Sequence, residues 1–261
     1  MSNAVILIFI IFLAAIAGNK FHVLTISGSM AAAVVGILIA LGLEVRGIIL
    51  LGLFFGTSSF WSKYKRKYKN KVEERLAKGS QRDWQQVVAN GGAASVASFF
   101  YYIDPDPLWI FTYCVLLASA NSDTWASEIG TLSKRFPISV RSFSVVPKGT
   151  SGAISFLGTF AGIAGSLLIA ATSYLLFKLT IGLAFLVFVF GFLGNIIDTL
   201  LGAYVQAAYK CPKCGLETEK LHHCGQRTGL IRGFSFLDND TVNFLSSFAA
   251  ALIGIWFYSL I

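Results

Sequence analysis

The chain has 261 residues, of which 55% are hydrophobic and only 13% are charged, and its mean hydropathy is +0.69. Soluble domains carry about 25% charged residues, so this composition excludes an ordinary soluble domain and indicates helices that face lipid. The formal net charge of +8 does not indicate nucleic-acid binding, because basic residues in membrane proteins gather in cytoplasmic loops beside anionic lipid head groups. We therefore expect an all-α integral membrane protein.

Eight apolar segments predict a polytopic bundle of about eight (seven or eight) transmembrane helices, which we treat as a single helical domain over residues 1–261. The segments cover residues 4–18, 29–43, 47–61, 84–103, 107–129, 152–177, 180–208 and 241–261. The second and third are shorter than the roughly 17 residues of a minimal straight span, so they could form a tilted or partly re-entrant hairpin. The first has no basic region before it, and we expect a span there rather than a cleaved signal peptide.

The basic residues fall almost entirely in alternate loops. Of the 21 Lys and Arg residues, 19 lie in the loops 19–28, 62–83, 130–151 and 209–240. The positive-inside rule places these loops in the cytoplasm and both termini outside, for a protein of the cell membrane. The loop 62–83 is expected to begin as a basic amphipathic helix along anionic head groups, and a role in setting topology is as good an interpretation of it as a catalytic one.

Carboxylates and amides inside apolar helices are costly and usually mark a functional site. Here they lie near the predicted cytoplasmic ends of several helices, at Asn90, Asn121, Asp123, Glu128, Asn195, Asp198, Asp238, Asn239, Asp240 and Asn243. Mg²⁺ takes oxygen ligands and bridges carboxylates to substrate phosphates, so we expect Asp123, Glu128, Asp198 and Asp240 to hold magnesium. The alternative is that these groups bond one another across helices as structural contacts.

Residues 147–152, with the sequence PKGTSG, predict a phosphate-binding loop. Lys148 supplies charge, Thr150 and Ser151 supply hydroxyl groups, and Gly149 and Gly152 let the backbone approach an anion. A helix expected to begin near Ala153 would direct its N–H groups at the same anion. The alternative is that this short segment serves only as a helix cap and a turn, as such segments often do.

The loop 209–240 contains a cluster of cysteine and histidine, KCPKCGLETEKLHHCGQ, at 210–226. Cys211, Cys214, Cys224 and one histidine, assigned here as His222, would complete a closed tetrahedral zinc site within a small clip at 211–224. A cytoplasmic redox pair or free thiols are the alternatives.

Several motifs, in order, resemble the DUF92 or transmembrane protein 19 family of membrane proteins, which includes plant phytyl-phosphate kinase. They are RDWQQVVANGG (82–92), ANSDTWASEIG (120–130), PKGTSGAISFLGT (147–159), GNIIDTLLGA (194–203) and NDTVN (239–243), and the resemblance covers about 160 residues. There is a more distant resemblance to CTP-dependent polyprenol kinases. Their G-D-x2-A-x3-G motif is similar to residues 122–130, with Ser122 in place of the first glycine. Their K-x-x-E-G-[ST] motif is similar to 148–150, with shorter spacing and no acidic residue.

The resemblance implies a membrane-embedded lipid kinase that transfers a phosphoryl group from CTP, or another nucleoside triphosphate, to a prenyl monophosphate such as phytyl or geranylgeranyl phosphate. Catalytic roles then fall to Asp123, Glu128, Lys148, Asp198 and Asp240. Substrate and nucleotide binding fall to Arg82, Asn90, Asn121, Lys148, Gly149, Thr150, Ser151, Asn195, Asn239 and Asn243. The alternatives are a transporter of an anionic or prenyl substrate, a CTP-dependent lipid-phosphate cytidylyltransferase and a non-catalytic scaffold.

Overall fold

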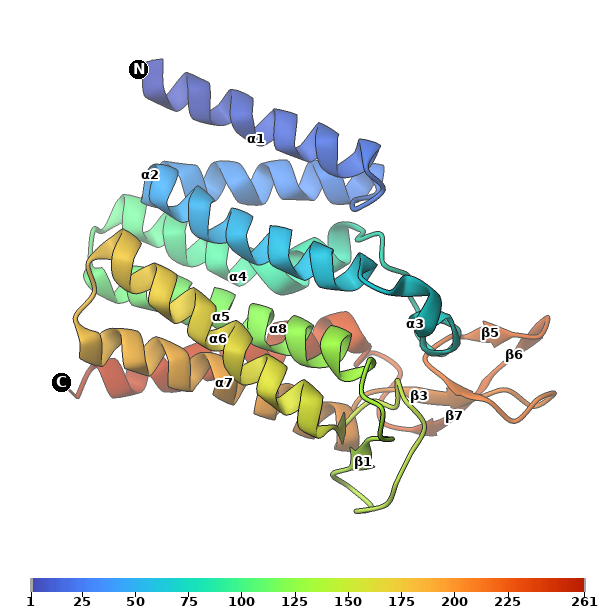
Figure 1. Cartoon of the computed structure of the whole chain (residues 1–261). Helices are drawn as coiled ribbons and strands as arrows, with labels where there is room; N and C mark the ends of the chain where they lie inside the picture. The colour runs from blue at the N-terminus through green and yellow to red at the C-terminus, as the bar shows by residue number, and fades with distance from the viewer. Residues whose placement is uncertain (1, 261) are drawn as a thin grey trace.

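The computed structural model describes residues 2–260, and most of them are helical (Figure 1). The helices are α1 (Ser2–Lys20), α2 (Ile26–Lys63), α3 (Arg66–Glu73), α4 (Trp84–Ile103), α5 (Pro107–Gly130), α6 (Phe156–Phe177), α7 (Ile181–Tyr204) and α8 (Asn239–Tyr258). The strands are β1 (Ile138–Ser139), β2 (Ala153–Ile154), β3 (Ala208–Lys210), β4 (Glu217–Thr218), β5 (His222–His223), β6 (Gln226–Arg227) and β7 (Gly229–Arg232). The long helices run lengthwise side by side, with α3 and the strands at one end and both chain ends at the other.

Helices lie over all eight predicted apolar segments, but by length and composition four are long and apolar enough to cross a membrane. These are α2, α6, α7 and α8. α2 holds two of the segments, because Glu44 has a non-helical backbone conformation (φ 50°, ψ −143°) that divides the helix. The two halves fold back on each other, so that Lys63 Nζ at the end of α2 donates to the carbonyl of Phe21, just before its start, at 2.6 Å. The predicted hairpin is therefore present, whereas the count of eight spans is not confirmed.

Two predicted boundaries are wrong because strands take the residues concerned. α6 begins at Phe156 rather than near 152, since Ala153 and Ile154 pair with β1 and Ser155 caps the helix by accepting from the Gly158 amide. α7 ends at Tyr204 rather than at 208, since β3 pairs with both β4 and β7 in a three-stranded sheet. Both corrections lie at the end of the bundle where the loops gather.

Helix α5 forms the centre of the bundle. Its residues from Phe111 to Ser122 are buried without interruption. α6 lies close against it, because a side chain at Gly158 would meet the Ala126 carbonyl at 2.8 Å and one at Gly165 would meet the Asn121 carbonyl at 3.0 Å. Small residues at such positions let helix backbones approach closely in membranes. The polar end of α5 is held in place by this packing.

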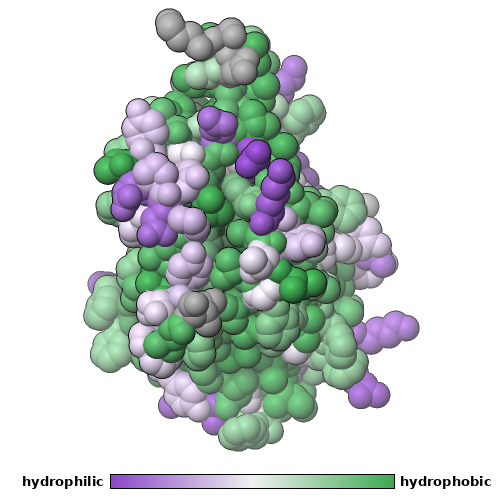
Figure 2. All heavy atoms as spheres, turned by 90° about the vertical axis from the view of Figure 1, so that its left-hand side faces the viewer, coloured by the Kyte–Doolittle hydropathy of each residue, from purple (hydrophilic) through white to green (hydrophobic). Residues whose placement is uncertain are grey.

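The outer surface is strongly apolar. Large side chains such as Phe9, Phe156, Ile181 and Trp256 are 60% or more exposed. Figure 2 shows the end of the molecule at which the chain begins and ends, and apolar residues cover most of it, with hydrophilic residues in smaller groups. Exposed apolar surface of this extent is what lipid contact requires.

Candidate functional site

A cavity of about 340 Å³ lies at the end of the bundle that carries α3 and the strands. Its walls come from α3, the loop that follows it, the first turns of α4, α6 and α8, the last turns of α2, α5 and α7, and the loop 147–155. These segments are far apart in the sequence. They meet because helices of alternating direction bring three helix starts and three helix ends to the same end of the bundle.

Nearly all residues that the sequence analysis assigned to nucleotide, substrate and magnesium line this one cavity. They are Arg82, Asn90, Asp123, Glu128, Lys148, Gly149, Thr150, Ser151, Asn195, Asp198, Asn239, Asp240 and Asn243. The predicted convergence of polar groups from separate helices is therefore what the fold produces.

Asn121 is the exception, and its assignment to substrate binding is corrected. The side chain is fully buried, its Nδ2 donates to the Gly165 carbonyl at 2.8 Å, and its Oδ1 accepts from Thr57 Oγ1 at 3.3 Å. It therefore joins α5 to α6 and α2 and has no free polar atom to offer a ligand. Asn121 therefore makes the structural contacts between helices that were the alternative interpretation of polar residues in apolar helices.

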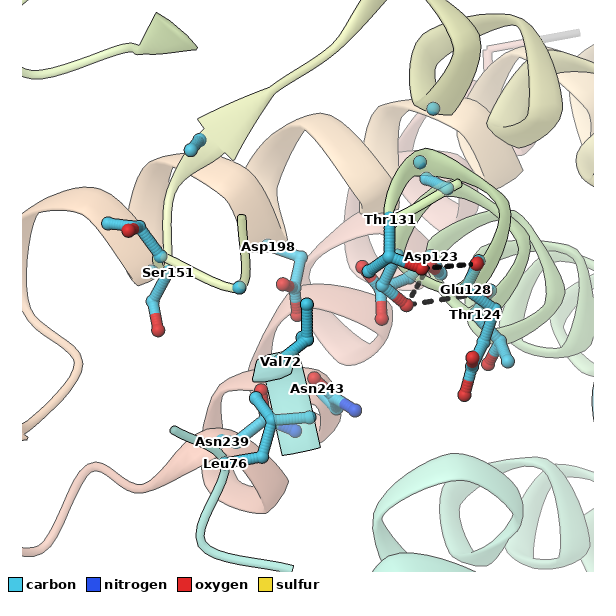
Figure 3. A pocket seen from close by; sticks show the side chains of 18 of the residues that line it. Val72, Leu76, Asp123, Thr124, Glu128, Thr131, Ser151, Asp198, Asn239 and Asn243 are labelled. Atoms are coloured by element: carbon cyan, nitrogen blue, oxygen red, sulfur yellow. Dashed lines mark hydrogen bonds between the residues drawn. The ribbon is translucent and has the colours of Figure 1, made fainter. Parts of the chain in front are cut away.

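The acidic centre of the cavity is the pair Asp123 on α5 and Asp198 on α7, whose carboxyl groups are close enough to influence each other electrostatically. Asp198 Oδ2 also accepts from Ser246 Oγ at 3.1 Å, and the Asn243 amide, with its nitrogen turned toward the acceptors, donates to the same oxygen at 3.1 Å. Figure 3 shows Asp123 and Asp198 among the residues that line the cavity, together with Val72 and Leu76. Among the side chains that the structure describes, no lysine or arginine forms an ion pair with either carboxylate. Two carboxylates this close together must share a proton or bind a cation.

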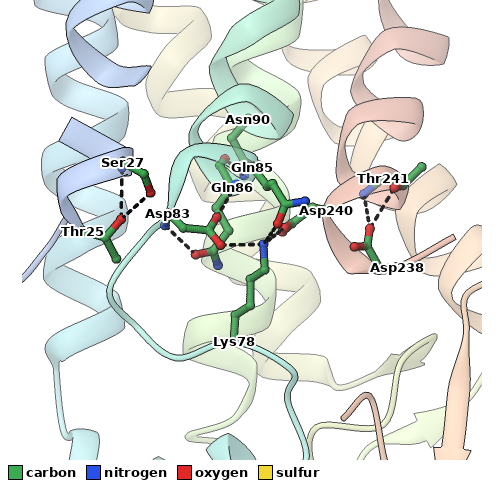
Figure 4. A network of polar contacts seen from close by, with 11 residues as sticks. Thr25, Ser27, Lys78, Asp83, Gln85, Gln86, Asn90, Asp238, Asp240 and Thr241 are labelled. Atoms are coloured by element: carbon green, nitrogen blue, oxygen red, sulfur yellow. Dashed lines mark hydrogen bonds and ion pairs between the residues drawn. The ribbon is translucent and has the colours of Figure 1, made fainter. Parts of the chain in front are cut away.

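The other two predicted metal ligands are held by lysines instead. Lys69 Nζ lies 2.6 Å from Glu128 Oε2, and only 4% of the Lys69 side chain is exposed. Lys78 Nζ lies 2.5 Å from Asp240 Oδ2 and 2.8 Å from Asp83 Oδ2, as Figure 4 shows. Each cation compensates a carboxylate that the fold has partly removed from water.

Electrostatic coupling in this group is visible in the pKa values of Lys78 and Asp83. Burial lowers the pKa of Lys78, but its hydrogen bonds with Asp240 and Asp83 outweigh burial and leave that pKa above the ordinary 10.5. Burial raises the pKa of Asp83, but the bonds from Lys78 and the Gln86 amide leave it below the ordinary 3.8. Both groups are therefore charged at neutral pH.

Sequence analysis missed Lys69 and Lys78 as cavity residues. Both lie in a loop with nine basic residues, which reads as a segment bound to head groups. The helix predicted there is α3, and it lies across the cavity with Val72 buried.

The loop 147–152 lines the cavity in an unusual backbone conformation, with Gly149 at φ +82° and Gly152 at φ +74°. Its lysine is engaged, because Lys148 Nζ donates to the carbonyl of Thr131 at 3.0 Å and to that of Ser133. The loop is therefore fastened to the end of α5. The helix start expected at Ala153 is displaced to Phe156, so the amides of α6 do not adjoin this loop directly.

Glu219 is a second group that sequence analysis missed. Its Oε1 accepts from Ser151 Oγ at 3.1 Å and from Gln206 Nε2 at 2.8 Å, and its Oε2 accepts from the Ala77 amide at 3.3 Å. Burial raises the pKa of Glu219, and these hydrogen bonds act in the opposite direction. No signal in the sequence separates Glu219 from the other charged residues of the cysteine-rich segment.

The comparisons with known proteins agree with the resemblance. The profile of an integral membrane protein family, DUF92, matches residues 9–251. The chain belongs to this family. Protein PGR of Arabidopsis thaliana is 30% identical over 239 residues, which are 80% of this chain and 82% of the plant protein. Protein VTE6, chloroplastic, of the same plant is 25% identical over 239 residues, with coverages of 89% and 64%. The uncharacterized membrane protein MJ0933 of Methanocaldococcus jannaschii is 34% identical over 146 residues, with coverages of 56% and 50%. No solved structure matches the chain.

The cysteine–histidine cluster of this DUF92 protein does not line the cavity described above. The structure corrects its fourth member, since Cys211, Cys214 and Cys224 gather around His223 and not His222. Successive residues of a strand point to opposite faces, and these two histidines form strand β5. His222 consequently faces away from the three sulfur atoms.

Proposed function

We propose that this DUF92 protein is a membrane-embedded prenyl-phosphate kinase. It would transfer the γ-phosphoryl group of CTP, or of another nucleoside triphosphate, to a prenyl monophosphate and so form the prenyl diphosphate. The observation that carries the proposal is that Asp123 of α5 and Asp198 of α7 line one cavity together. This carboxylate pair lies in a cavity where the neighbouring acids Glu128 and Asp240 are each bound by a lysine.

The donor set of this pair suits magnesium. Mg²⁺ is bound in proteins by one or two carboxylates, with substrate phosphates and water completing its octahedral shell. Asp123 and Asp198 would hold the ion, and Asn243 and Ser246, which already donate to Asp198, would orient its carboxylate. Bound magnesium would neutralise charge on the triphosphate. Glu128 and Asp240 could become ligands of the magnesium ion only after their ion pairs with Lys69 and Lys78 break. We therefore propose two direct ligands, Asp123 and Asp198, in place of the four carboxylates predicted from the sequence.

The cations around the cavity supply the complementary half of the proposal. Lys69, Lys78, Arg82 and Lys148 all line it. A triphosphate and a prenyl monophosphate brought together carry several negative charges, and phosphoryl transfer depends mainly on neutralising and aligning them. Lysines already paired with carboxylates can rotate to phosphate oxygens, since their ammonium groups are point charges on flexible stems.

The proposed reaction needs no strong base. A phosphate oxygen of the prenyl monophosphate attacks the γ-phosphorus, a new P–O bond forms, and the bond to the β–γ bridging oxygen breaks. The nucleoside diphosphate leaves with that electron pair. Because the attacking oxygen is already anionic near neutral pH, the chain's residues serve to align and neutralise the reactants.

The position of the cavity favours a lipid substrate at a membrane surface over transport. Transporter sites lie near the bilayer midplane between repeated halves, whereas this cavity lies at one end of the bundle. The loops at that end hold 19 of the 21 basic residues, and the positive-inside rule would therefore place the cavity at the cytoplasmic face of the cell membrane, with anionic lipids around it. There a lipid phosphate could enter the cavity while its prenyl chain stays in the bilayer.

The experiment is a transfer assay with purified protein in nanodiscs, using γ-labelled CTP or ATP, Mg²⁺ and phytyl, geranylgeranyl or farnesyl monophosphate. We expect label in the prenyl diphosphate, and none with Asp123→Asn. The matched control is Asp104→Asn, the same change at an exposed residue at the other end of α4, which should retain activity. Label only in free pyrophosphate would indicate a cytidylyltransferase instead, and full activity of Asp123→Asn would contradict the assigned site.

A further inference from the structure

The cysteine-rich insert holds a ligand set of metal-site dimensions. One ligand atom from each of Cys211, Cys214, His223 and Cys224 lies within 4.8 Å of the others. His223 Nδ1 is 3.4 Å from the sulfur of Cys214 and 3.3 Å from that of Cys224. Zinc bonds of about 2.3 Å to sulfur and about 2.0 Å to nitrogen, in tetrahedral directions, separate neighbouring ligands by roughly 3.5–3.8 Å. The two histidine–sulfur distances are close to this spacing, and all four ligand atoms lie near enough to share one zinc ion.

The backbone around these ligands is built to direct them inward. Gly215 at φ +74° and Gly225 at φ +75° follow Cys214 and Cys224 directly, and Cys224 itself has φ +53°. Both cysteine-containing turns therefore use left-handed residues to reverse direction beside the cluster. All three cysteines are free, and three thiols with one imidazole match a metal better than a disulfide.

His223 connects the cluster to the segment that follows α3. Its Nε2 lies 3.5 Å from Glu74 Oε1. With Nδ1 bound to a metal, Nε2 carries the ring proton and can donate to this carboxylate. A carboxylate on the second nitrogen is the usual partner of a metal-bound histidine, because it fixes the ring's tautomer and orientation. Glu74 is thus placed as an outer partner of the site.

Strand β4 and the next residue, Glu219, fasten the same segment at three further points. The Arg75 carbonyl accepts from the Glu219 amide at 2.8 Å and from Thr218 Oγ1 at 2.7 Å, and the Ala77 amide donates to Glu219 Oε2 at 3.3 Å. The next residue is Lys78, which is paired with Asp240 inside the cavity. The insert thereby fixes one wall of the cavity, although its cysteines lie outside it.

We propose that Cys211, Cys214, His223 and Cys224 bind a structural Zn²⁺ ion, and that this ion holds the insert against residues 74–78 so that Lys78 and Glu219 stay at the cavity. All four positions are filled by protein side chains, so the zinc has no open position for substrate and is not catalytic. Zinc acts here as a positioning element at a distance from the carboxylates.

The two neighbouring histidines provide a matched test of the metal site. Zinc and iron are measured by mass spectrometry of the intact purified protein and its variants. We expect about one zinc per chain in the wild type and in His222→Ala, and less than a tenth of that in His223→Ala and in Cys214→Ser. Cobalt exchanged into the wild type should give the absorption of tetrahedral thiolate coordination. Zinc retention by His223→Ala, equal loss in both histidine variants, or iron in place of zinc would overturn the assignment.

The positioning role has its own readout, which does not depend on kinase activity. Hydrogen exchange of residues 66–82 is compared before and after zinc is removed by a chelator, with α6 as the internal reference. We expect faster exchange in 74–78, by about tenfold or more, and unchanged exchange in α6. Unchanged exchange in 74–78 after complete zinc removal would overturn the positioning role. Because no substrate is present, a failure here is distinct from a failure of the proposed reaction.

Discussion

Asp123 and Asp198 are two acids close together where a soluble surface would keep them apart. Their mutual repulsion and removal from water make the metal-free cavity costly, and a bound cation relieves that cost. The pair should therefore lower the stability of the folded protein when no metal is bound, and it should be required for activity when metal is bound. Such opposition between stability and activity is common at sites that bind a charged ligand.

Replacing one acid separates these two effects. Asp198→Asn should lower the rate of phosphoryl transfer by about 100-fold or more, since it weakens an electrostatic clamp on the transferring group. It should leave the melting temperature measured without Mg²⁺ unchanged or higher. Mg²⁺ should raise the melting temperature of the wild type and not that of the variant. A variant that melts lower without metal, yet still gains stability from Mg²⁺, would contradict the assignment of Asp198.

The ion pairs of Lys78 predict how the stability of the protein depends on pH. Its pKa is raised above 10.5 in the folded protein, so its ion pairs contribute full stability below pH 10.5 and lose it as pH rises further. The pKa of Asp83 is lowered below 3.8, so the contribution of that carboxylate is full above pH 3.8 and is lost as pH falls further. The difference in melting temperature between the wild type and Lys78→Met should therefore be flat from neutral pH to about pH 9 and shrink at both extremes. A difference that varies across neutral pH would show that another group controls it.

Among the elements, the loop 147–152 depends on contact with the end of α7. A side chain at Gly152 would meet the backbone nitrogen and Cα of Ala203 at 2.3 Å, and the residue has φ +74°. Gly152→Ala should therefore destabilise the protein by more than about 2 kcal/mol, through left-handed strain and overlap with fixed backbone. Gly79→Ala is the matched control, because Gly79 lines the same cavity and an added methyl group there would meet nothing within 4 Å. It should change stability by less than about 0.5 kcal/mol, as measured by thermal unfolding. Equal effects would show that the 147–152 loop can move away from α7.

Elements that follow from local patterns were predicted well. Apolar runs that begin directly after caps such as Asp83 and Asp106 define α4 and α5, and polar residues near the ends of helices define most of the cavity. What failed depended on tertiary contacts. Lys69 enters the cavity because α3 folds over it, and Glu219 enters because it and Thr218 bond to Arg75 and Ala77. His223 rather than His222 faces the cysteines because of the pairing of β5 with β6.

Over the whole molecule, charge and the chain ends divide between the two ends of the bundle. The cavity, the insert and most basic residues lie at one end, and the chain begins and ends at the other. The proposed magnesium, nucleotide and metal-bound thiolates all lie at the cavity end, and the proposal therefore requires this end to face a compartment that supplies nucleotide and keeps thiols reduced. The cytoplasm meets both requirements.

The native cysteines make this orientation testable. Cys211, Cys214 and Cys224 lie at the cavity end, and the fourth, Cys114, is buried. A membrane-impermeant maleimide should therefore not label the wild type in intact cells, and it should label it after permeabilisation with a chelator. Asp104→Cys, at the opposite end between α4 and α5, should be labelled in intact cells. The wild type is the matched control, because it has the same three thiols at the cavity end and lacks only the added thiol at position 104. The contradicting outcome is that the wild type is labelled in intact cells and the variant gains no label. The cavity would then open outward, where no nucleoside triphosphate is supplied. That result would contradict both the orientation and the kinase proposal.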